Sequence, residues 1–438
     1  MFKKVFPLSA ILSLRFLGLF LVLPVISVYA LELEGSTPLL VGIVVGGYAL
    51  TQALFQVPFG TMSDKVGRKP TLLFGLIVFL IGSIICAYSD NIYTLMVGRF
   101  LQGAGAIGSV ITAMISDLVA EEIRGKAMAI MGASIALSFA LAMGVGPVLG
   151  AAYGVDFLFI LTAVFAVLAI ILLFTKVPTP PRIKHTYHAT SKTSDILKDP
   201  NLLNMIVINA MQKGLMTIAF VLIPIILTSD TFAWEKSDLY MAYLPAMLFG
   251  LAAMGPAAVF GEKYNKPKEI FLLSIVLFIG SFLVMGLTAS STIFIVGVVM
   301  FFVAFNMMEP LVQSMISKFA KVHQKGAALG ISNSVAYFAT FVGGTSAGLL
   351  LGFSDRATIG VSVAVVATIW LLWTLKLQNP TKYSHLYIPQ EEVDISKLQD
   401  LEQEHIAEWY INDTEKLIVI KYVSSAMEQE ALKAKISK

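Results

Sequence analysis

Four charged side chains lie inside long apolar stretches of the sequence: Arg15, Arg99, Lys213 and Glu309. A charge within an apolar segment of membrane-crossing length is costly, so it normally faces a partner charge or a water-filled cavity. Glu309 is the only carboxylate deep in such a stretch, which makes it the best candidate for a group that binds and releases a proton. A permanent structural ion pair between Lys213 and Glu309 is an equally weighted alternative.

The depth of each charge within its predicted span divides the four charges into two groups. At the helical rise per residue, Arg15, Lys213 and Glu309 each lie about 13–17 Å from the same side of the membrane. Arg99 lies about 10 Å from the opposite side, and we expect it to be functional rather than purely structural. Polar side chains in the same or comparable stretches predict a polar substrate cavity. They are Tyr48, Gln52, Gln56, Asn209, Gln212, Asn306 and Gln313.

A charged turn joins two apolar runs, 38–59 and 71–87, over residues Gly60–Pro70. Asp64 can accept backbone N–H groups or pair with a base, and Arg68 offers a planar donor fork, for which Asp117 is the best partner. Bases alone would set membrane topology, but an acid does nothing for orientation. We therefore predict a conformational switch. Its members are Gly60, Asp64, Gly67, Arg68, Lys69, Asp117 and Arg124.

Glycines punctuate two further stretches. The Arg99–Gly105 stretch contains Gly103, where close helix packing is the better interpretation than ligand contact. The Gly144–Gly150 stretch combines small residues with a proline, which suits a kinked helix that rocks against a neighbour in the other half of the chain. The predicted packing hinge comprises Gly103, Gly144, Gly146, Pro147 and Gly150.

The elements that must position these residues are membrane helices. The chain is 57% apolar and 13% charged, whereas an ordinary soluble domain is about 25% charged. Apolar runs near 20 residues can cross a bilayer core of about 30 Å. Twelve spans are predicted, at 7–31, 38–59, 71–88, 92–117, 127–151, 155–175, 202–228, 238–260, 269–288, 291–317, 326–351 and 357–376.

Basic residues fix the expected orientation. One set of connections and ends holds 20 Lys and Arg residues, and the alternate connections hold only Lys236 and Arg356. Because cytoplasmic loops carry the excess of basic residues, both termini and the charged turn are predicted to be cytoplasmic. We expect a multi-pass protein of the inner membrane, with the lipid bilayer as its surroundings.

The membrane part repeats itself. When the sequence is aligned with itself at an offset of 201 residues, Ile111–Ser116 aligns with Val312–Ser317. Arg124-Gly125 aligns with Lys325-Gly326 at the same offset. Parallel six-span repeats around a central binding site are a known transporter architecture. We expect an N-terminal six-helix bundle over 1–176, a cytoplasmic linker over 177–201 and a C-terminal six-helix bundle over 202–378.

A small polar module follows at 383–438. Its pattern predicts a strand at Leu386–Ile388, a helix at 394–403, a hairpin formed by Ile406–Ile411 and Leu417–Val423, and a helix at Met427–Ile436. That order suits a ferredoxin-like α+β fold, although the chain ends before a fourth strand. The module could bind a ligand, dock on the loops or mediate self-association. Its charge balance does not indicate nucleic-acid binding.

Several chemistries are not expected. The single cysteine, Cys86, permits no internal disulfide and no cysteine-based metal site. The five histidines lie in loops or in the C-terminal module, and the sequence contains neither a nucleophile–base pair nor a phosphate-binding loop. We therefore expect no enzyme activity, no metal and no cofactor.

The motifs resemble those of a known family. The Gly60–Lys69 turn looks like the loop between spans two and three of the major facilitator superfamily, Arg99–Gly105 resembles its span-four motif, and Gly144–Gly150 resembles the span-five motif of its drug:proton antiporters. A branch of this superfamily carries a small ferredoxin-like domain at the C-terminus. The expected fold is therefore all-α, with twelve transmembrane helices in two six-helix repeats and a small α+β module.

The resemblance also implies roles. Asp64 would contact the start of span eleven and Arg68 would contact Asp117, and both contacts would hold the cytoplasmic side closed in an outward-open state. Arg99 would belong with Arg15, Lys213 and Glu309 to the proton-coupling apparatus. The implied function is proton-coupled export of small, partly apolar compounds. A solute importer of the same fold and a membrane sensor that acts through its C-terminal module are the alternatives.

Overall fold

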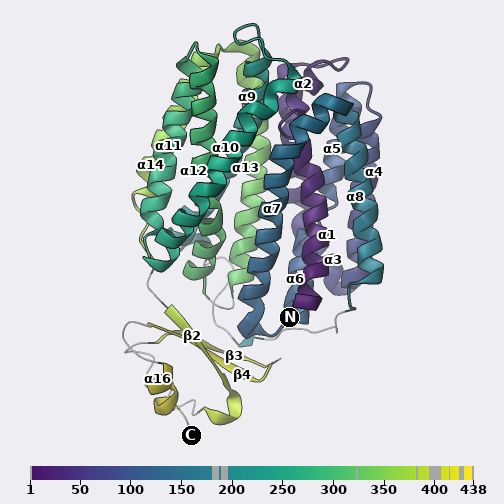
Figure 1. Cartoon of the computed structure of the whole chain (residues 1–438). Coiled ribbons are helices and arrows are strands. Elements are labelled where there is room, and N and C mark those ends of the chain that lie inside the picture. Colours follow the sequence, from purple (N-terminus) through teal and green to yellow (C-terminus); the bar gives the residue numbers. More distant parts are fainter. Residues whose placement is uncertain are drawn as a thin grey trace.

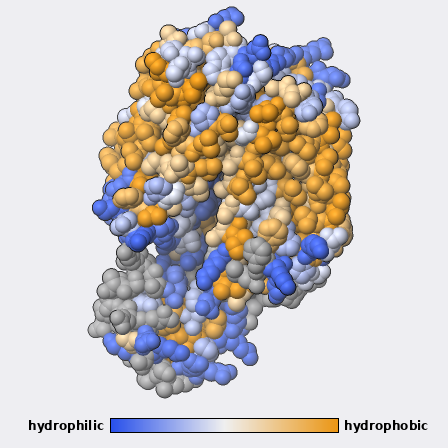
Figure 2. Space-filling view, in the orientation of Figure 1, coloured by the Kyte–Doolittle hydropathy of each residue, from blue (hydrophilic) through white to orange (hydrophobic). Residues whose placement is uncertain are grey.

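The computed structural model describes residues 2–179, 187–188, 196–321, 324–380, 383–393, 406–413, 415–423 and 429–436. Twelve helices within these residues are long and apolar enough to cross a membrane, which confirms the predicted number of spans. Large apolar side chains such as Leu54, Ile81, Ile171, Leu248 and Ile369 are exposed around the bundle. Figure 2 shows the resulting apolar belt between two polar ends.

The first six spans form what we call the N-half. Its helices are α1 (Phe2–Leu21), α2 (Ile26–Leu31), α3 (Pro38–Lys65), α4 (Arg68–Ala87), α5 (Ile92–Ala104), α6 (Gly108–Leu118), α7 (Glu121–Tyr153) and α8 (Val155–Thr175).

The last six spans form the C-half. Its helices are α9 (Pro200–Thr228), the 3₁₀ helix η2 (Lys236–Leu239), α10 (Tyr240–Ala258), the π-helix η3 (Val259–Lys263), α11 (Pro267–Leu287), α12 (Ser291–Phe319), α13 (Lys325–Phe353) and α14 (Arg356–Thr374). In Figure 1 the two halves stand side by side, with the β-module below them at the end where both termini lie. We call this end the module side and the opposite end the far side.

Polar caps explain where several spans begin. Thr37 Oγ1 accepts a hydrogen bond from Leu40 N at the start of α3, and Pro38 occupies the first helical position. Asp199 caps α9 in the same way, followed by Pro200. Side-chain oxygens at these positions satisfy backbone N–H groups that have no partner inside the helix. The caps mark the boundaries between apolar runs and loops.

Two predicted boundaries were wrong, and one further span contains a break that was not predicted. The first span ends at Leu21 and is separated from α2 by a turn containing Pro24, which has no N–H to continue the helix. The fourth span is divided into α5 and α6 at Gly105–Ile107. The charged turn is shorter than expected because α3 continues to Lys65, which leaves only Val66 and Gly67 between helices. Gly60 is therefore a helical residue, and Gly67 takes a φ of +117° that favours glycine.

The two halves repeat the same element order at the predicted offset. Adding 201 to the residue numbers of α8 gives 356–376, and the equivalent helix α14 spans 356–374. The bounds of α5–α6 become 293–319, against 291–319 for α12. The helical bounds of the two halves therefore follow the internal sequence repeat.

The β-module is a four-stranded antiparallel sheet with the order β1-β3-β4-β2. Its strands β2 (Tyr383–Pro389), β3 (Ile406–Asn412) and β4 (Leu417–Val423) match the predicted strand and hairpin, and α16 (Gln429–Ile436) matches the second helix. The predicted helix at 394–403 lies outside the described residues. These elements fit a small ferredoxin-like domain. The fourth strand, β1 (Tyr187–His188), was not predicted and comes from the linker between the halves.

The halves approach each other most closely on the far side, between α3 and α13. A Cβ atom placed on Gly42 would lie 2.1 Å from the carbonyl oxygen of Gly344, and one on Gly348 would lie 2.3 Å from that of Pro38. An ion pair between Lys236 and Glu32 also joins the halves at this end. The pseudo-equivalent pair, α7 and α10, is in contact as well.

The module side is open by comparison. A Cβ atom placed on Gly326 or Gly330, at the start of α13, would meet nothing within 4 Å. Figure 2 shows the surface hollowed between the halves at this end, above the β-module. The described structure is therefore closed on the far side and open on the module side.

The α3–α13 contact makes a testable prediction. Replacing Gly42 by Leu puts a side chain where the Gly344 backbone lies, at an overpacking cost of about 1–3 kcal/mol. We expect a longer distance between spin labels at Thr37 and Asp355, measured by double electron–electron resonance. Gly352→Leu, on an open face of α13, is the matched control and should leave the distance unchanged. An unchanged distance in the Gly42 variant would contradict the assignment of this contact.

Candidate functional site

An acidic group and a basic group meet inside the C-half. Glu309 on α12 accepts hydrogen bonds from Lys213 Nζ, at 2.9 Å and 2.8 Å to its two oxygens, and from Gln212 Nε2 at 3.0 Å. Lys213 also lies over the ring of Phe305, 4.8 Å from its centroid. The sequence placed these groups at one depth, and the structure brings them into direct contact.

The Lys213–Glu309 pair is not sealed from solvent. The Glu309 side chain is 35% exposed and the Lys213 side chain is 23% exposed. Solvent therefore reaches this carboxylate while it accepts charge-assisted hydrogen bonds from the neighbouring ammonium group. Protonation would leave Lys213 without its counter-charge. The arrangement can therefore convert a proton-binding event into a change in an ion pair.

Two arginines form a second cluster inside the N-half. Arg99 donates to the carbonyl oxygens of Val44 and Val45, at 3.2 Å and 3.4 Å, and to Gln102 Oε1 at 2.8 Å. Arg15 donates to Gln52 Oε1 at 3.2 Å and to the Gln102 carbonyl at 3.3 Å. The two arginines have neutral oxygen acceptors rather than carboxylates.

Tyr48 completes this N-half cluster. The Arg99 guanidinium lies 4.7 Å from the centroid of its ring. Gln102 Nε2 donates to Ser83 at 3.0 Å, which ties α5 to α4. Both arginine side chains are fully buried, so these contacts replace water around the charges.

Tyr337 on α13 links the two clusters and was missed by the sequence interpretation. It interacts electrostatically with Arg15 and Tyr48 of the N-half and with Glu309 of the C-half. Tyr337 follows Asn333 by four residues, so both lie on one face of α13. This polar face could have been recognised from the sequence. The charged groups therefore converge on the interface between the N-half and the C-half, which we call the seam.

The remaining predicted cavity residues divide into two groups. Asn209 donates to Ser332 Oγ at 2.9 Å, and Gln313 donates to Asn333 at 3.1 Å, so both face α13. Asn306 donates to the Phe302 carbonyl of its own helix at 2.8 Å and packs against Gly250. The backbone carbonyl of Gln56 accepts a hydrogen bond from Ser109 Oγ, whereas its side-chain Oε1 has no partner among the described residues. Asn209 and Gln313 therefore lie beside the C-half cluster, and Asn306 bonds within its own helix.

The charged turn forms a compact network on the module side. Arg68 donates to Asp117 Oδ2 at 2.8 Å and to Asp64 Oδ1 and Ser63 Oγ, both at 2.6 Å. The Arg68–Asp117 contact is the pairing that the sequence implied. Asp64 is different, because its side chain is 64% exposed and pairs with Arg68 rather than with the start of α13. The expected Asp64 contact is absent from the described residues in this arrangement, since the module side is open.

The glycine stretches pack mainly within the N-half. A Cβ atom on Gly103 would lie 1.8 Å from the Tyr48 carbonyl oxygen, and one on Gly146 would lie 2.3 Å from that of Leu21. Gly144 faces Leu244 of the C-half at 3.7 Å, whereas Gly150 faces Val25 and Leu158. The helix α7 continues through Pro147. Among the four glycines of the predicted hinge, Gly144 is the one whose nearest neighbour belongs to the other half.

The β-module contacts both halves. Arg124 at the start of α7 pairs with Glu415 in the β3–β4 hairpin at 3.3 Å. Lys421 Nζ donates to the Lys318 carbonyl at 3.3 Å, and Lys325 Nζ lies 3.5 Å from His385 Nε2. Burial, reinforced by the neighbouring Lys325 and Lys421, lowers the pKa of His385 from 6.5 to about 4.

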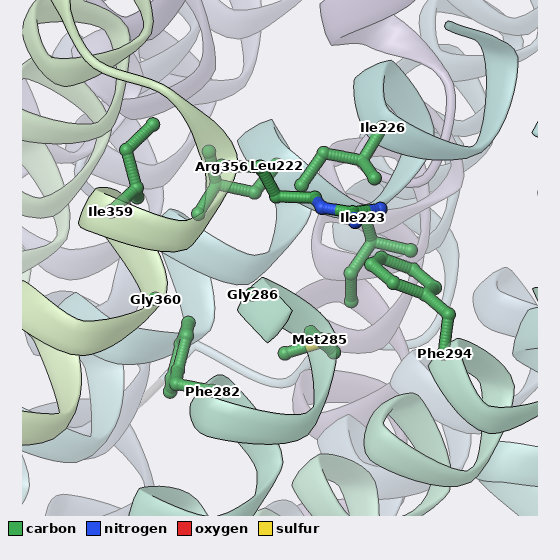
Figure 3. Close-up of a pocket in the computed structure, with 10 residues that line it drawn as sticks. All are labelled: Leu222, Ile223, Ile226, Phe282, Met285, Gly286, Phe294, Arg356, Ile359 and Gly360. Atoms are coloured by element: carbon green, nitrogen blue, oxygen red, sulfur yellow. The ribbon is translucent and has the colours of Figure 1, made fainter. Parts of the chain in front are cut away.

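A small pocket in the C-half contains none of the predicted site residues. It lies between α9, α11, α12 and α14, and Figure 3 shows the Arg356 guanidinium beside Ile223. Its free volume is about 10 Å³, enough for one water molecule. Among the described residues, no group of three or more His, Cys, Asp or Glu is placed to hold a metal ion.

The fold and the polar seam between two repeated bundles define a membrane transporter. The Major Facilitator Superfamily model matches residues 8–344 and 216–425, so the chain belongs to this superfamily. It is 35% identical over 425 residues to the inner membrane transport protein YajR of Escherichia coli (strain K12), covering 94% of this chain and 92% of that protein. The predictions of a transporter fold and of a non-enzymatic family are thereby confirmed.

Two other similarities agree with this assignment. The chain is 28% identical over 387 residues to the quinolone resistance protein NorA of Staphylococcus aureus (strain MSSA476), covering 84% of this chain and 96% of that protein. A solved structure of a bacterial homologue of the human lysosomal transporter Spinster, inward-facing and occupied, has a TM-score of 0.68 at 14% identity. That similarity covers 85% of this chain and 95% of that one, and shows the fold alone.

The Arg68–Asp117 pair generates a stability prediction. Asp117→Asn leaves the half-buried Arg68 without its buried counter-charge, and we expect a loss of about 1–3 kcal/mol. A thermal unfolding assay on the purified protein would report it as a lower Tm. Asp64→Asn is the matched control and should change stability by less than about 0.5 kcal/mol because Asp64 is exposed. Equal effects of the two substitutions would contradict the assigned difference.

Proposed function

We propose that the protein is a proton-coupled secondary transporter of the inner membrane that exports small, partly apolar compounds by alternating access. The observation that supports this most strongly is the Glu309 carboxylate, which is paired with Lys213 and yet partly exposed. The similar protein YajR is named as an inner membrane transport protein, which favours the inner membrane as the location. The similar protein NorA is named for quinolone resistance, which favours export as the direction of transport.

Protonation of Glu309 is the proposed driving event. The ionised carboxylate holds Lys213 on α9 to α12, and the neutral acid would hold it less strongly. A ligand or proton shifts a conformational equilibrium only as far as it binds one state better than the other. The proton therefore favours the state in which Glu309 is neutral and Lys213 finds another acceptor. Arg99 and Arg15 would provide fixed positive charge on the N-half side of the seam, and we assign both to the same proton-coupling apparatus.

The moving units are the two six-helix bundles, 1–176 and 202–378, joined by the linker 177–201. With the 20 basic residues on the module side, that side and both termini would face the cytoplasm. The arrangement closed on the far side would then be open to the cytoplasm. In the alternate state the module side would close, and Asp64 would reach the start of α13. Gly60, Gly67, Lys69 and Arg124 would take part in that closure as neighbours of the Arg68 network.

The C-terminal module, 383–438, would dock on both halves rather than act as a separate sensor. The Arg124–Glu415 pair supports a contact to the N-half, and the contacts of Lys421 and His385 support a contact to the C-half. The linker strand β1 also pairs with β3, which holds part of the linker against the same sheet. Docking would favour the cytoplasm-open arrangement because it fixes the separation of the two halves.

Proton coupling can be tested with purified protein in proteoliposomes and a fluorescent quinolone as probe. We expect quinolone-dependent proton flux in the parent, and loss of at least about tenfold in Glu309→Gln because the amide cannot release a proton. Glu391→Gln, on the exposed surface of the module, is the matched control. Transport of the probe by the parent without proton flux, or full coupling in Glu309→Gln, would refute this assignment.

The docked module should be sensitive to pH. His385 faces Lys325 of α13 and Lys421 of β4, and its pKa is lowered from 6.5 to about 4. Because the undocked state binds the proton more tightly, docking is fully favourable above pH 6.5 and weakens as the pH falls towards 4. Spin labels at Lys65 and Glu391 should separate between pH 7.5 and pH 5. His385→Gln should remove this dependence, and an unchanged pH response would contradict it.

A further inference from the structure

The side chain of Arg15 has hydrogen-bonding capacity that the protein does not use. It is fully buried, and its Nε and Nη1 atoms have no hydrogen-bond partner in the part of the chain that the structure describes, while Nη2 contacts Gln52 and Gln102. The buried Gln52 lies beside this guanidinium, with Tyr337 of the C-half as a neighbour. Two N–H donor atoms of one buried guanidinium are therefore unsatisfied among the described residues. Unsatisfied buried donors are costly, and a guanidinium group more so, which points to a ligand that supplies acceptors.

The surrounding charge has the matching sign. Of the four charges deep in the described spans, Glu309 is the only acid, and its two oxygens are bonded to Lys213. Arg15 and Arg99 contact amide and carbonyl oxygens or aromatic rings. Two positive charges are therefore left without a carboxylate in the low-dielectric interior. Such a site attracts an anion and repels a cation.

The unused donors lie close to the seam between the two halves. Arg15 and Gln52 come from the N-half, and Tyr337 of the C-half interacts with both. A row of rings continues from Arg15, whose guanidinium lies 5.6 Å from the centroid of Phe16. Phe16 stacks on Phe20 at 5.3 Å. The row then crosses the seam from Phe20 through Phe139 to Phe305, with centroid separations of 5.1 Å and 5.6 Å.

We infer that the transported compounds are amphipathic organic anions. A carboxylate or sulfonate accepts hydrogen bonds from Arg15 and Gln52, and an aromatic or aliphatic body lies against the rings of Phe16, Phe139 and Phe305. This assignment rests on the proposed transport function and specifies its substrate class. Arg15 acts as the specificity residue because its planar fork matches a carboxylate, whereas a cation meets like charge at the same place.

Three naphthalene derivatives of similar size test this inference: 1-naphthoate, 1-naphthalenemethanol and 1-naphthylmethylammonium. Binding to the full-length protein in nanodiscs at pH 7.5 is measured by isothermal titration calorimetry. We expect the anion to bind roughly tenfold or more tightly than either analogue. Arg15→Gln should remove this preference, and Arg15→Lys should retain part of it. Lys376→Gln, which removes a positive charge at the module side away from the seam, is the matched control.

Each outcome decides between the alternatives. Equal binding of the three compounds to the parent, or preference for the ammonium, overturns the inference whatever the variants do. A preference that persists in Arg15→Gln also overturns it. If Arg15→Gln does not fold, Gln52→Leu serves instead and should weaken naphthoate binding several-fold without affecting the alcohol.

The same compounds separate this inference from the proposed function. Proteoliposomes that move the ammonium but not the naphthoate with protons would leave the proposed transport function standing and remove the anion assignment. Tight naphthoate binding with no movement of any compound would support the anion site and contradict the transport function.

Discussion

The backbones of α3 and α13 touch where Gly42 faces Gly344, and the open and closed ends of the molecule follow from that contact. With no side chain between them, these helices bring the far side of the two halves together. Two rigid bundles that meet at one end must separate at the other, so Gly326 and Gly330 of α13 face open space on the module side. The exposed Asp64 and the distribution of charges along the seam are consequences of the same geometry.

The seam joins two kinds of polar site with different tasks. The C-half contributes an acid–base pair that reaches solvent, which suits proton exchange. The N-half contributes two buried arginines without acids, which suit recognition of negative charge. Tyr337 interacts with members of both. Proton binding and substrate binding would then be linked because both change the electrostatics of one seam, and each site lies on a different moving unit.

The membrane fold was predictable because apolar length and charge asymmetry are properties of local sequence. The spans, the internal repeat and the depth of Glu309 follow from counting residues. Equal depth made a pair with Lys213 one of two alternatives, and the structure shows that contact. Other features depend on tertiary context. The break after Leu21 and the two-residue turn at Val66-Gly67 are set by individual backbone conformations. The strand β1 forms only because the linker meets the edge of β3. The Asp64 contact depends on which end is closed, and a sequence does not specify a state.

The rocking of two halves about the seam is the central claim, and distances measured at both ends of one sample test it most directly. Double electron–electron resonance would use label pairs at Thr37 and Asp355 on the far side and at Lys65 and Lys321 on the module side, with and without a proton gradient. The account predicts that the two distances change in opposite directions. Distances that rise or fall together, or a change at one end alone, would contradict it.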